Sequence, residues 1–239
     1  MNVSYGSTPF LVILFHIQKK YLSCLIVIFV LCISCSENPK SSAESNPGVV
    51  TDIDGNVYNT VKIGEQWWLV ENLKVTRFRN GDSIPNITDN SQWTNLSSAA
   101  YCNYNNDLNN VPSYGRLYNW FAVHDSRNIA PEGWHVATDE DWKDLEKHIG
   151  INPSDIDYIG FRGRDEASIL EEGEFAALPA GFCGLDGHFN NIGNLGYWWT
   201  ASEFCRLNAW YRALTIGSNM VNRNFDSKIY GFSVRCVRD

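Results

Sequence analysis

The side chains of this sequence that could perform redox, metal or nucleophilic chemistry are few and widely spaced. Four cysteines are disulfide candidates if the protein matures in an oxidising compartment: Cys102, Cys183, Cys205 and Cys236. An even count suggests two bridges, but the spacing allows three connectivities, and free buried thiols are the alternative. The histidines of the predicted mature chain never recur at a metal-ligand spacing such as i, i+4. Because a Gly-rich phosphate loop and a G-x-S-x-G elbow are also missing, we predict no catalytic residue, no metal and no cofactor.

Two groups of carboxylates invite a catalytic or calcium-binding interpretation. The acids between Asp165 and Glu174 lie in one stretch that we expect to be a solvated loop, since a glycosidase would need two of them on opposite sides of a sugar. Asp52, Asp54 and Asn56 stand at alternate positions, as in a calcium loop. Counted from Asp52, however, Gly55 is at position 4, whereas an EF-hand loop has its Gly at position 6. We therefore predict a hairpin turn at Asp54-Gly55. The amide-rich segment Asn103–Asn110 is the remaining, minor calcium candidate.

The C-terminal third combines aromatic rings with amides in a way that is typical of sugar and protein recognition. The rings supply apolar area and the amides supply oriented hydrogen bonds. Successive strand residues point to opposite faces, so at least one of Trp198 and Trp199 should be core. We expect Trp210 to be core and Tyr211 to be available to a ligand. The predicted ligand-binding residues are Trp199, Tyr211, Asn208, Asn219, Asn222 and Asn224. The alternative is that these rings, Tyr197 included, simply fill a core.

Short strands and two helices would position these residues. Residues 51–69 alternate as consecutive strands, with turns at Asp54-Gly55 and Gly64-Glu65. Helical spacing predicts one helix over 114–124, with Ser113 as N-cap. A second helix should start at the capping-box string Thr138–Asp141, bury Trp142, Leu145 and Ile149, and end at Gly150. Segments 196–200, 209–216 and 231–237 return to strand patterns. The order predicts one α+β domain with an antiparallel sheet over residues 50–239.

The first 49 residues have the pattern of an export signal and a tether. Lys19-Lys20 precede a nearly continuous apolar run, 21–33, which is too short for a membrane span but typical of a signal peptide. Ser34-Cys35 resembles a lipoprotein cleavage site, so we predict a signal segment over 1–34 and lipid attachment at Cys35. Residues 35–49 are polar and rich in serine, which predicts a flexible tether. An uncleaved membrane anchor is the alternative.

The charge of the chain limits its partners. The net charge is −8, and removal of the leader with its two lysines brings it to −10. Such an acidic surface repels phosphate backbones, and we therefore do not expect nucleic acid as a partner. The predicted partners are the membrane, through the lipid anchor, and a glycan or a cell-surface protein.

Seven strings occur in order along the domain. They are Asp54–Tyr58, Trp67–Leu73, Tyr101–Asp107, Gly115–Trp120, Pro131–Val136, Gly196–Trp199 and Gly231–Asp239. Together they resemble the Fibrobacter succinogenes major paralogous domain, over residues 51–239. The resemblance implies a secreted or lipid-anchored protein, in a family whose activity is undefined. Ala137–Trp142 and Gly231–Arg235 also resemble the formylglycine-generating-enzyme branch of the C-type lectin-like fold, which implies that fold here.

These observations combine into one functional hypothesis with two rivals. We expect a non-enzymatic lipoprotein of the cell envelope, at the outer membrane or cell surface, that binds a glycan or a protein through its C-terminal loops. The first rival is an enzyme with a formylglycine-generating-like cleft, and the second is a purely structural envelope protein. The lack of closely spaced cysteines and of a histidine cluster argues against the enzyme. Nothing in the sequence separates the structural protein from the binding module.

Overall fold

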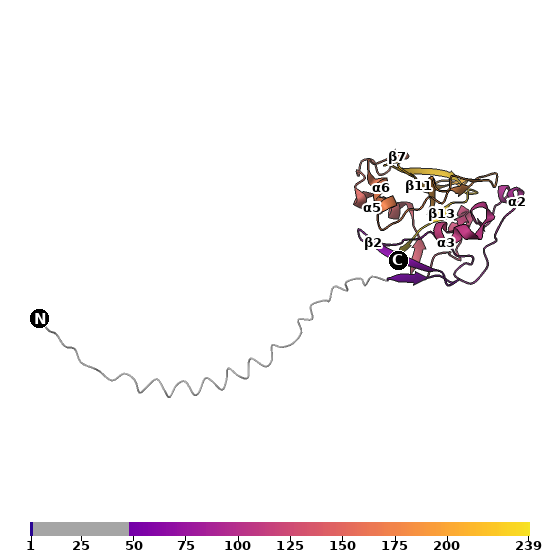
Figure 1. Cartoon of the computed structure of the whole chain (residues 1–239), viewed down its shortest axis with the longest axis horizontal. Coiled ribbons are helices and arrows are strands. Elements are labelled where there is room, and N and C mark those ends of the chain that lie inside the picture. Colours follow the sequence, from indigo (N-terminus) through magenta and orange to yellow (C-terminus); the bar gives the residue numbers. More distant parts are fainter. Residues whose placement is uncertain (2–47) are drawn as a thin grey trace, which may run out of the picture. The chain divides into compact units, whose positions relative to one another are not determined.

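The computed structural model describes Met1 and residues 48–239, which form an α+β structure as the sequence predicts (Figure 1). The predicted leader, Cys35 and the tether up to residue 47 lie outside the described residues. Strand β1 begins at Val49, inside the segment predicted as tether. None of the helices within residues 48–239 combines the length and the apolar character needed to cross a membrane.

One five-stranded sheet joins the two ends of the domain. In spatial order its strands are β1 (Val49–Thr51), β2 (Val57–Ile63), β3 (Gln66–Leu69), β14 (Cys236–Arg238) and β6 (Trp134–Val136), all antiparallel to their neighbours. Both predicted turns are confirmed. The β1–β2 loop holds Asp54-Gly55 and is closed by Asp52, whose carboxylate accepts from the backbone N–H groups of Asp54 and Asn56 at 2.9 Å each. Gly64-Glu65 connects β2 to β3.

A second five-stranded sheet carries the C-terminal aromatic residues. Its order is β13 (Ser233–Val234), β10 (Leu195–Glu203), β11 (Asn208–Thr215), β12 (Val221–Ser227) and β7 (Gly160–Arg162). Only the β10–β13 pair among these is parallel. β10 and β11 confirm two of the predicted strands, whereas β12 was not predicted. Two smaller pairs are β4 (Tyr101–Cys102) with β5 (Leu117–Tyr118), and β8 (Phe182–Cys183) with β9 (Phe189–Asn190).

Helix α5 (Asp139–Ile149) confirms the predicted capping box. The Asp141 backbone N–H donates to Thr138 Oγ1 at 3.2 Å, and the Thr138 N–H donates to the Asp141 carboxylate at 2.8 Å. The helix ends at Gly150, which adopts a φ of 120° that favours glycine. Trp142 and Leu145 are fully buried and Ile149 is partly buried, so the predicted apolar stripe faces the core.

The single helix predicted over 114–124 is wrong. Helix α3 (Val111–Tyr114) stops at Gly115, then β5 follows, and α4 (Trp120–Val123) starts afresh with Asn119 as its N-cap. Gly115 has a φ of 73°, and a Cβ there would come within 2.9 Å of the Asn72 and Leu73 carbonyl oxygens. The helical spacing of apolar residues therefore spans two short helices that a strand separates.

The remaining helices are short. They are α2 (Asn90–Thr94), α6 (Glu166–Glu172), and two 3₁₀ turns at Tyr104–Asn106 and Leu108–Asn110. Helix α6 corrects the prediction of a solvated acidic loop over this stretch. Ala167 and Leu170 are fully buried, so one side of the helix packs on the core, while Ile169 is exposed on another side.

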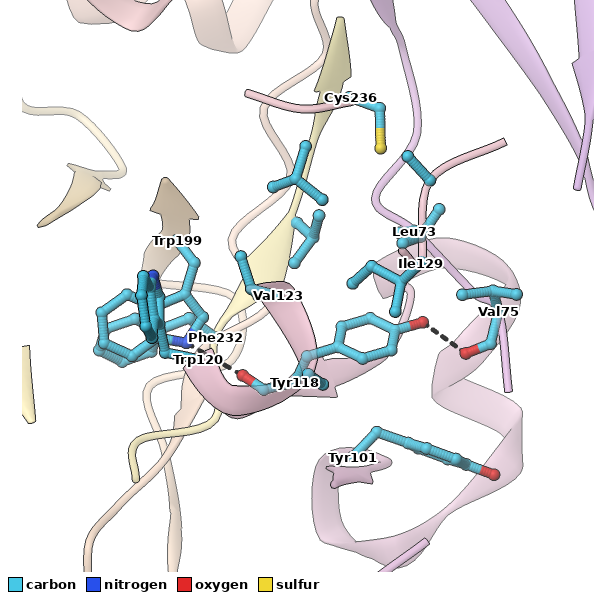
Figure 2. Close-up of a cluster of buried hydrophobic side chains, with 14 of the residues drawn as sticks. Leu73, Val75, Tyr101, Tyr118, Trp120, Val123, Ile129, Trp199, Phe232 and Cys236 are labelled. Atoms are coloured by element: carbon cyan, nitrogen blue, oxygen red, sulfur yellow. Dashed lines mark hydrogen bonds between the residues drawn. The ribbon is translucent and has the colours of Figure 1, made fainter. Parts of the chain in front are cut away.

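Three groups of buried side chains hold these elements together. The first core lies on one face of the second sheet and includes Tyr118, Trp120, Trp199 and Phe232 (Figure 2). The second lies on the opposite face, where Trp142 of α5 packs near Trp198. The third surrounds Trp93 and contains two cysteines. Because the second sheet is covered on both faces, neighbouring residues such as Trp198 and Trp199 are both fully buried.

Candidate functional site

The register of the second sheet brings several predicted binding residues to one face. On β11 and β12, Tyr211 lies opposite Asn224, Ala213 opposite Asn222, and Ala209 opposite Asp226. Residues directly opposite each other on antiparallel strands point to the same side. We call this surface the tyrosine face, and it consists of Tyr197, Tyr211, Tyr230, Asn222, Asn224 and Asp226.

The rings of the tyrosine face rest on the first core. Phe232 forms the floor, with ring centroids 5.0 Å from Tyr197, 5.2 Å from Tyr211 and 5.4 Å from Tyr230. Phe182, on β8, packs edge-on against Tyr197 at 5.1 Å. Tyr197 and Tyr230 are half-buried and Tyr211 is 8% exposed. The ring positions are therefore set by packing, which leaves the polar ends of the side chains at the surface.

Those polar ends lack partners within the described part of the chain. The hydroxyls of Tyr197, Tyr211 and Tyr230 form no hydrogen bond with a described residue. The Asn222 side-chain oxygen is buried and also has no hydrogen-bond partner there. Unpaired polar atoms at partly buried positions cost folding free energy unless a ligand or water satisfies them.

Asp226 is the charged group of this face. Its carboxylate accepts from the Ser227 backbone N–H at 2.8 Å, and no described lysine, arginine or histidine pairs with it. Desolvation raises the pKa of Asp226 above its ordinary value of 3.8. Desolvation and then the Asp226 charge raise the pKa values of Tyr197, Tyr211 and Tyr230, so all three phenols lie near this carboxylate and stay protonated donors.

The other three predicted binding residues are not exposed on the tyrosine face. Trp199 is 0% exposed, and its indole N–H donates to the Tyr118 backbone oxygen at 3.0 Å (Figure 2). The same N–H also donates to the Tyr230 backbone oxygen at 3.3 Å. The prediction that Trp199 contacts a ligand is therefore wrong for this conformation. Asn208 shares its side of β11 with Trp210, which is the opposite face. Asn219 lies in the β11–β12 loop and donates to Asp165 Oδ1 at 3.0 Å.

The assignment of Trp210 as core and of Tyr211 as the exposed ring is reversed. Trp210 is partly exposed, with the Arg223 guanidinium 3.6 Å from its ring centroid and Phe225 packed edge-on at 5.7 Å. Tyr211 is 8% exposed. Trp210 lies on the other face of β11, where it packs edge-on against Phe204 and Phe225 and under the Arg223 guanidinium.

A comparison with protein families gives the relationship of the whole domain. A family model described as the Fibrobacter succinogenes major domain matches residues 61–238. The chain belongs to this family. Comparisons with curated proteins and with solved structures find no match.

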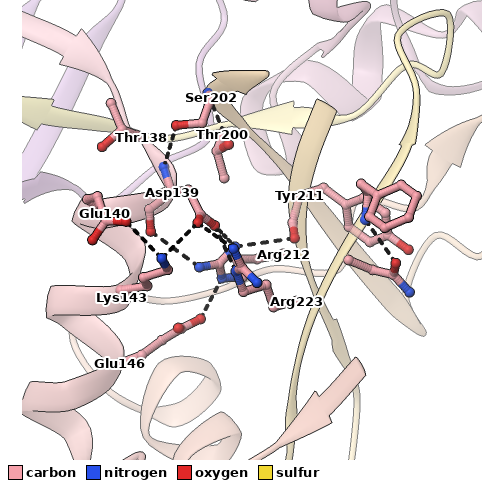
Figure 3. A network of polar contacts seen from close by, with 12 residues as sticks. Thr138, Asp139, Glu140, Lys143, Glu146, Thr200, Ser202, Tyr211, Arg212 and Arg223 are labelled. Carbon is pink, nitrogen blue, oxygen red and sulfur yellow. Dashed lines mark hydrogen bonds and ion pairs between the residues drawn. The ribbon is translucent and has the colours of Figure 1, made fainter. Parts of the chain in front are cut away.

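The match to the Fibrobacter succinogenes major domain includes all of the tyrosine face. It also includes a buried network of charges on the other face of the second sheet (Figure 3). There Asp139 of α5 binds Arg212 and Arg223 at 2.8 and 2.7 Å. Glu146 binds Arg162 and Arg212 at 2.8 and 2.6 Å. Although desolvation opposes it, hydrogen bonds and charge from both arginines hold the pKa of Asp139 below its usual range.

This network fastens α5 to β7, β11 and β12 and is not a binding site. Arg212 and Glu146 are both 0% exposed, and each of the two carboxylates has at least two cationic partners. A ligand could reach these groups only after the helix separated from the sheet. The network therefore supports the tyrosine face from behind.

The other carboxylates considered as calcium ligands, Asp52 and Asp107, form hydrogen bonds within their own loops. The Asp52 carboxylate accepts from the Asn56 and Tyr58 side chains at 2.8 and 2.6 Å, so it holds the β1–β2 turn together. In the minor calcium candidate, Asp107 accepts from the Asn109 N–H at 2.9 Å. Within residues 48–239 no three His, Cys, Asp or Glu side chains come together as a metal site.

The four predicted disulfide candidates are free thiols in the structure. Cys102 and Cys183 share the third core, Cys236 belongs to the first core, and Cys205 is exposed between β10 and β11. This arrangement does not provide the two bridges that the even count suggests.

Sequence reasoning missed Asp226 and Tyr230. The strand alternation of Val221–Ser227 contained the signal, since Asn222, Asn224 and Asp226 are spaced to share one face. The sequence analysis included Asn222 and Asn224, but it did not predict strand β12 and therefore did not group Asp226 with them.

Proposed function

We propose that this protein is a lipid-anchored envelope lipoprotein that binds a glycan on the tyrosine face. The observation that carries the proposal is Asp226, a half-buried carboxylate with no cationic partner among the described residues, near three tyrosine hydroxyls that also lack partners. Desolvation of the Asp226 carboxylate opposes folding, and no described arginine nearby offsets this free energy. Perturbed, unpaired groups of this kind gather at functional sites.

The chemistry of the face fits a polyhydroxylated ligand. The carboxylate accepts hydrogen bonds from sugar hydroxyls, while tyrosine hydroxyls and the amides of Asn222 and Asn224 both donate and accept. The partly exposed rings of Tyr197 and Tyr230 offer apolar area to the C–H groups of a sugar ring, whereas the Tyr211 ring is buried beside them. A rigid aromatic floor lowers the entropic cost of binding, because Phe232 and its neighbours already fix the rings.

Charge narrows the class of glycan. The mature chain is expected to carry −10, and Asp226 adds a negative charge at the face itself. Neutral or amino-bearing sugars are therefore favoured over sulfated or uronic-acid polymers, which would be repelled.

The other parts of the proposal rest on the sequence. Lipid attachment at Cys35 and display at the outer membrane or cell surface follow from the signal pattern and from the acidic, serine-containing tether. The finer fold, a C-type lectin-like domain, is supported by the two strings that resemble that fold. One of them includes the start of α5 and the other includes β13.

The rival enzyme has no observation in its favour. The two cysteines that share a core, Cys102 and Cys183, are 0% and 1% exposed, so a substrate does not reach their thiols in this conformation. A purely structural envelope protein would leave the unpaired groups of the tyrosine face without an explanation.

The test is a glycan array probed with the full-length protein, purified in detergent, as wild type, Asp226→Asn and Glu65→Gln. Asp226→Asn keeps the size of the side chain and removes the desolvated charge, so we expect an unchanged or higher melting temperature. Binding of the array hit should fall about 10- to 100-fold, the usual effect of losing a hydrogen bond to a charged group. Glu65, which is exposed on the other sheet, serves as the matched control.

The outcomes discriminate clearly. Wild-type affinity in Asp226→Asn would place the site elsewhere, and a wild-type protein that binds no glycan but captures a surface protein would replace the glycan with a protein ligand. A strong loss of stability in Asp226→Asn would show that the carboxylate is structural.

A further inference from the structure

Two buried cysteines from distant parts of the chain meet in the third core. Cys102 ends β4 and Cys183 ends β8, and both side chains are almost completely buried, at 0% and 1% exposure. Their neighbours in that core include Trp93, Leu117 and Ala180. After desolvation, the neighbouring Cys183 thiol is the next cause that raises the pKa of Cys102, which agrees with the two side chains sharing this core.

Backbone pairing on both sides fixes the positions of these two thiols. Cys102 lies opposite Leu117 in the β4–β5 pair, and Cys183 exchanges two backbone hydrogen bonds of 2.9 Å with Gly231. A Cβ at Gly231 would come within 2.9 Å of both the Cys183 Cβ and the Trp93 ring. Glycine at 231 therefore allows the close approach that presses Cys183 into the core, beside Cys102.

The other two cysteines of the domain have no such neighbour. Cys205 is exposed in the turn between β10 and β11, and Cys236 lies on β14 opposite Val136, in the first core. Each of the three connectivities that the sequence leaves open would pair all four cysteines in two bridges. The structure instead brings only Cys102 and Cys183 together, so it supports one bridge.

We propose that the mature protein carries one disulfide, between Cys102 and Cys183, and that Cys205 and Cys236 remain thiols. The two thiols lose two protons and two electrons to a disulfide oxidant, which is reduced to two thiols, and the Sγ–Sγ bond forms. The oxidant is of the thiol–disulfide exchange class that acts on exported proteins, so the source of oxidation, though not the pairing, rests on the proposed export.

Burial determines when this bond forms. Desolvation raises the pKa of Cys102 well above its ordinary value, so the reactive thiolate is scarce in the folded protein. Exchange should therefore take place during folding, and the finished bond should resist reduction until the domain opens. The bond ties β8 to β4, and Phe182, the residue before Cys183, packs against Tyr197 of the tyrosine face. Oxidation thus fixes one edge of the proposed binding surface.

The test is peptide mapping of the full-length protein after export and purification in detergent. The alkylating reagent is added first without and then with denaturant, always before any reductant. We expect one linked peptide pair that contains Cys102 and Cys183, labelling of Cys205 without denaturant, and labelling of Cys236 only with denaturant. The double variant Cys205→Ala/Cys236→Ala should retain the same link.

A second measurement uses stability. Reductant should lower the melting temperature of the wild type by roughly 5–15 °C, the shift expected for opening a loop of this length in a domain of this size. It should leave Cys102→Ser/Cys183→Ser unchanged. If that variant does not fold, the map of the wild type decides alone.

Two results would overturn the proposal. One is a link through Cys205 or Cys236, and the other is four reactive thiols after refolding with a mixture of oxidised and reduced glutathione. Because the map involves no glycan, its outcome is independent of the proposed binding function.

Discussion

Glu146 is the side chain whose loss should reveal how strongly α5 is held to the second sheet. It is fully buried and accepts from Arg162 Nη1 and Nη2 at 2.9 and 2.8 Å and from Arg212 Nε at 2.6 Å. Glu146→Gln keeps the shape of the side chain but leaves two buried guanidinium groups with one anion fewer. Removing one partner of a buried ion pair costs about 3–5 kcal/mol. In a domain of this size the melting temperature should fall by about 6–20 °C.

Thermal and urea unfolding of the full-length protein, followed by circular dichroism, would measure this loss. Asp144→Asn is the matched control on the same helix, since its ion pair with Lys147 at 2.9 Å lies at the surface and should contribute less than about 0.5 kcal/mol. A Glu146→Gln variant that unfolds within about 1 kcal/mol of wild type would refute our account of the network. It would mean that the apolar stripe of α5 alone holds the helix.

Three further predictions concern single residues. Thr138→Ala should lose about 0.5–2 kcal/mol, the usual cost of removing an N-cap, and unchanged urea melts would mean that the capping box is not stabilising. Hydrogen bonds to Asp141 and Asp239 raise the pKa of His135 above 6.5, so its contribution to stability is complete below that pH and is lost as the pH rises through the raised value. Melts between pH 6 and 9 should show this loss in wild type and not in His135→Gln. Palmitate labelling should disappear in Cys35→Ala, and equal label in both proteins would disprove lipid attachment there.

Local signals in the sequence predicted those elements whose residues act within a few positions of each other. The capping box at Thr138, the turn at Asp54-Gly55 and the apolar stripe of α5 depend on neighbours within one or two turns of chain. The prediction of one helix over 114–124 was wrong because a tertiary contact interrupts the helix that local spacing favours. Gly115 takes a positive φ against the Asn72 and Leu73 backbone, more than 40 positions away, and no spacing of apolar residues encodes that contact.

The buried charges escaped prediction for a related reason. Arg212 and Arg223 look like ordinary exposed cations in a strand pattern, and the acids that neutralise them come from α5, over 60 residues earlier. Once α5 covers that face with Asp139 and Glu146, an arginine becomes an acceptable core residue.

The two faces of β12 now explain each other. Arg223 points toward α5, where Asp139 satisfies it, and Asn222, Asn224 and Asp226 point the other way, where no described cation meets the acid. The arginines of this sheet are thus paired on the side of α5, and none of them pairs with Asp226 on the tyrosine face. The desolvated, unpaired carboxylate of Asp226, on the reverse of a strand that the buried network holds in place, is the strongest physical argument that the tyrosine face binds a ligand.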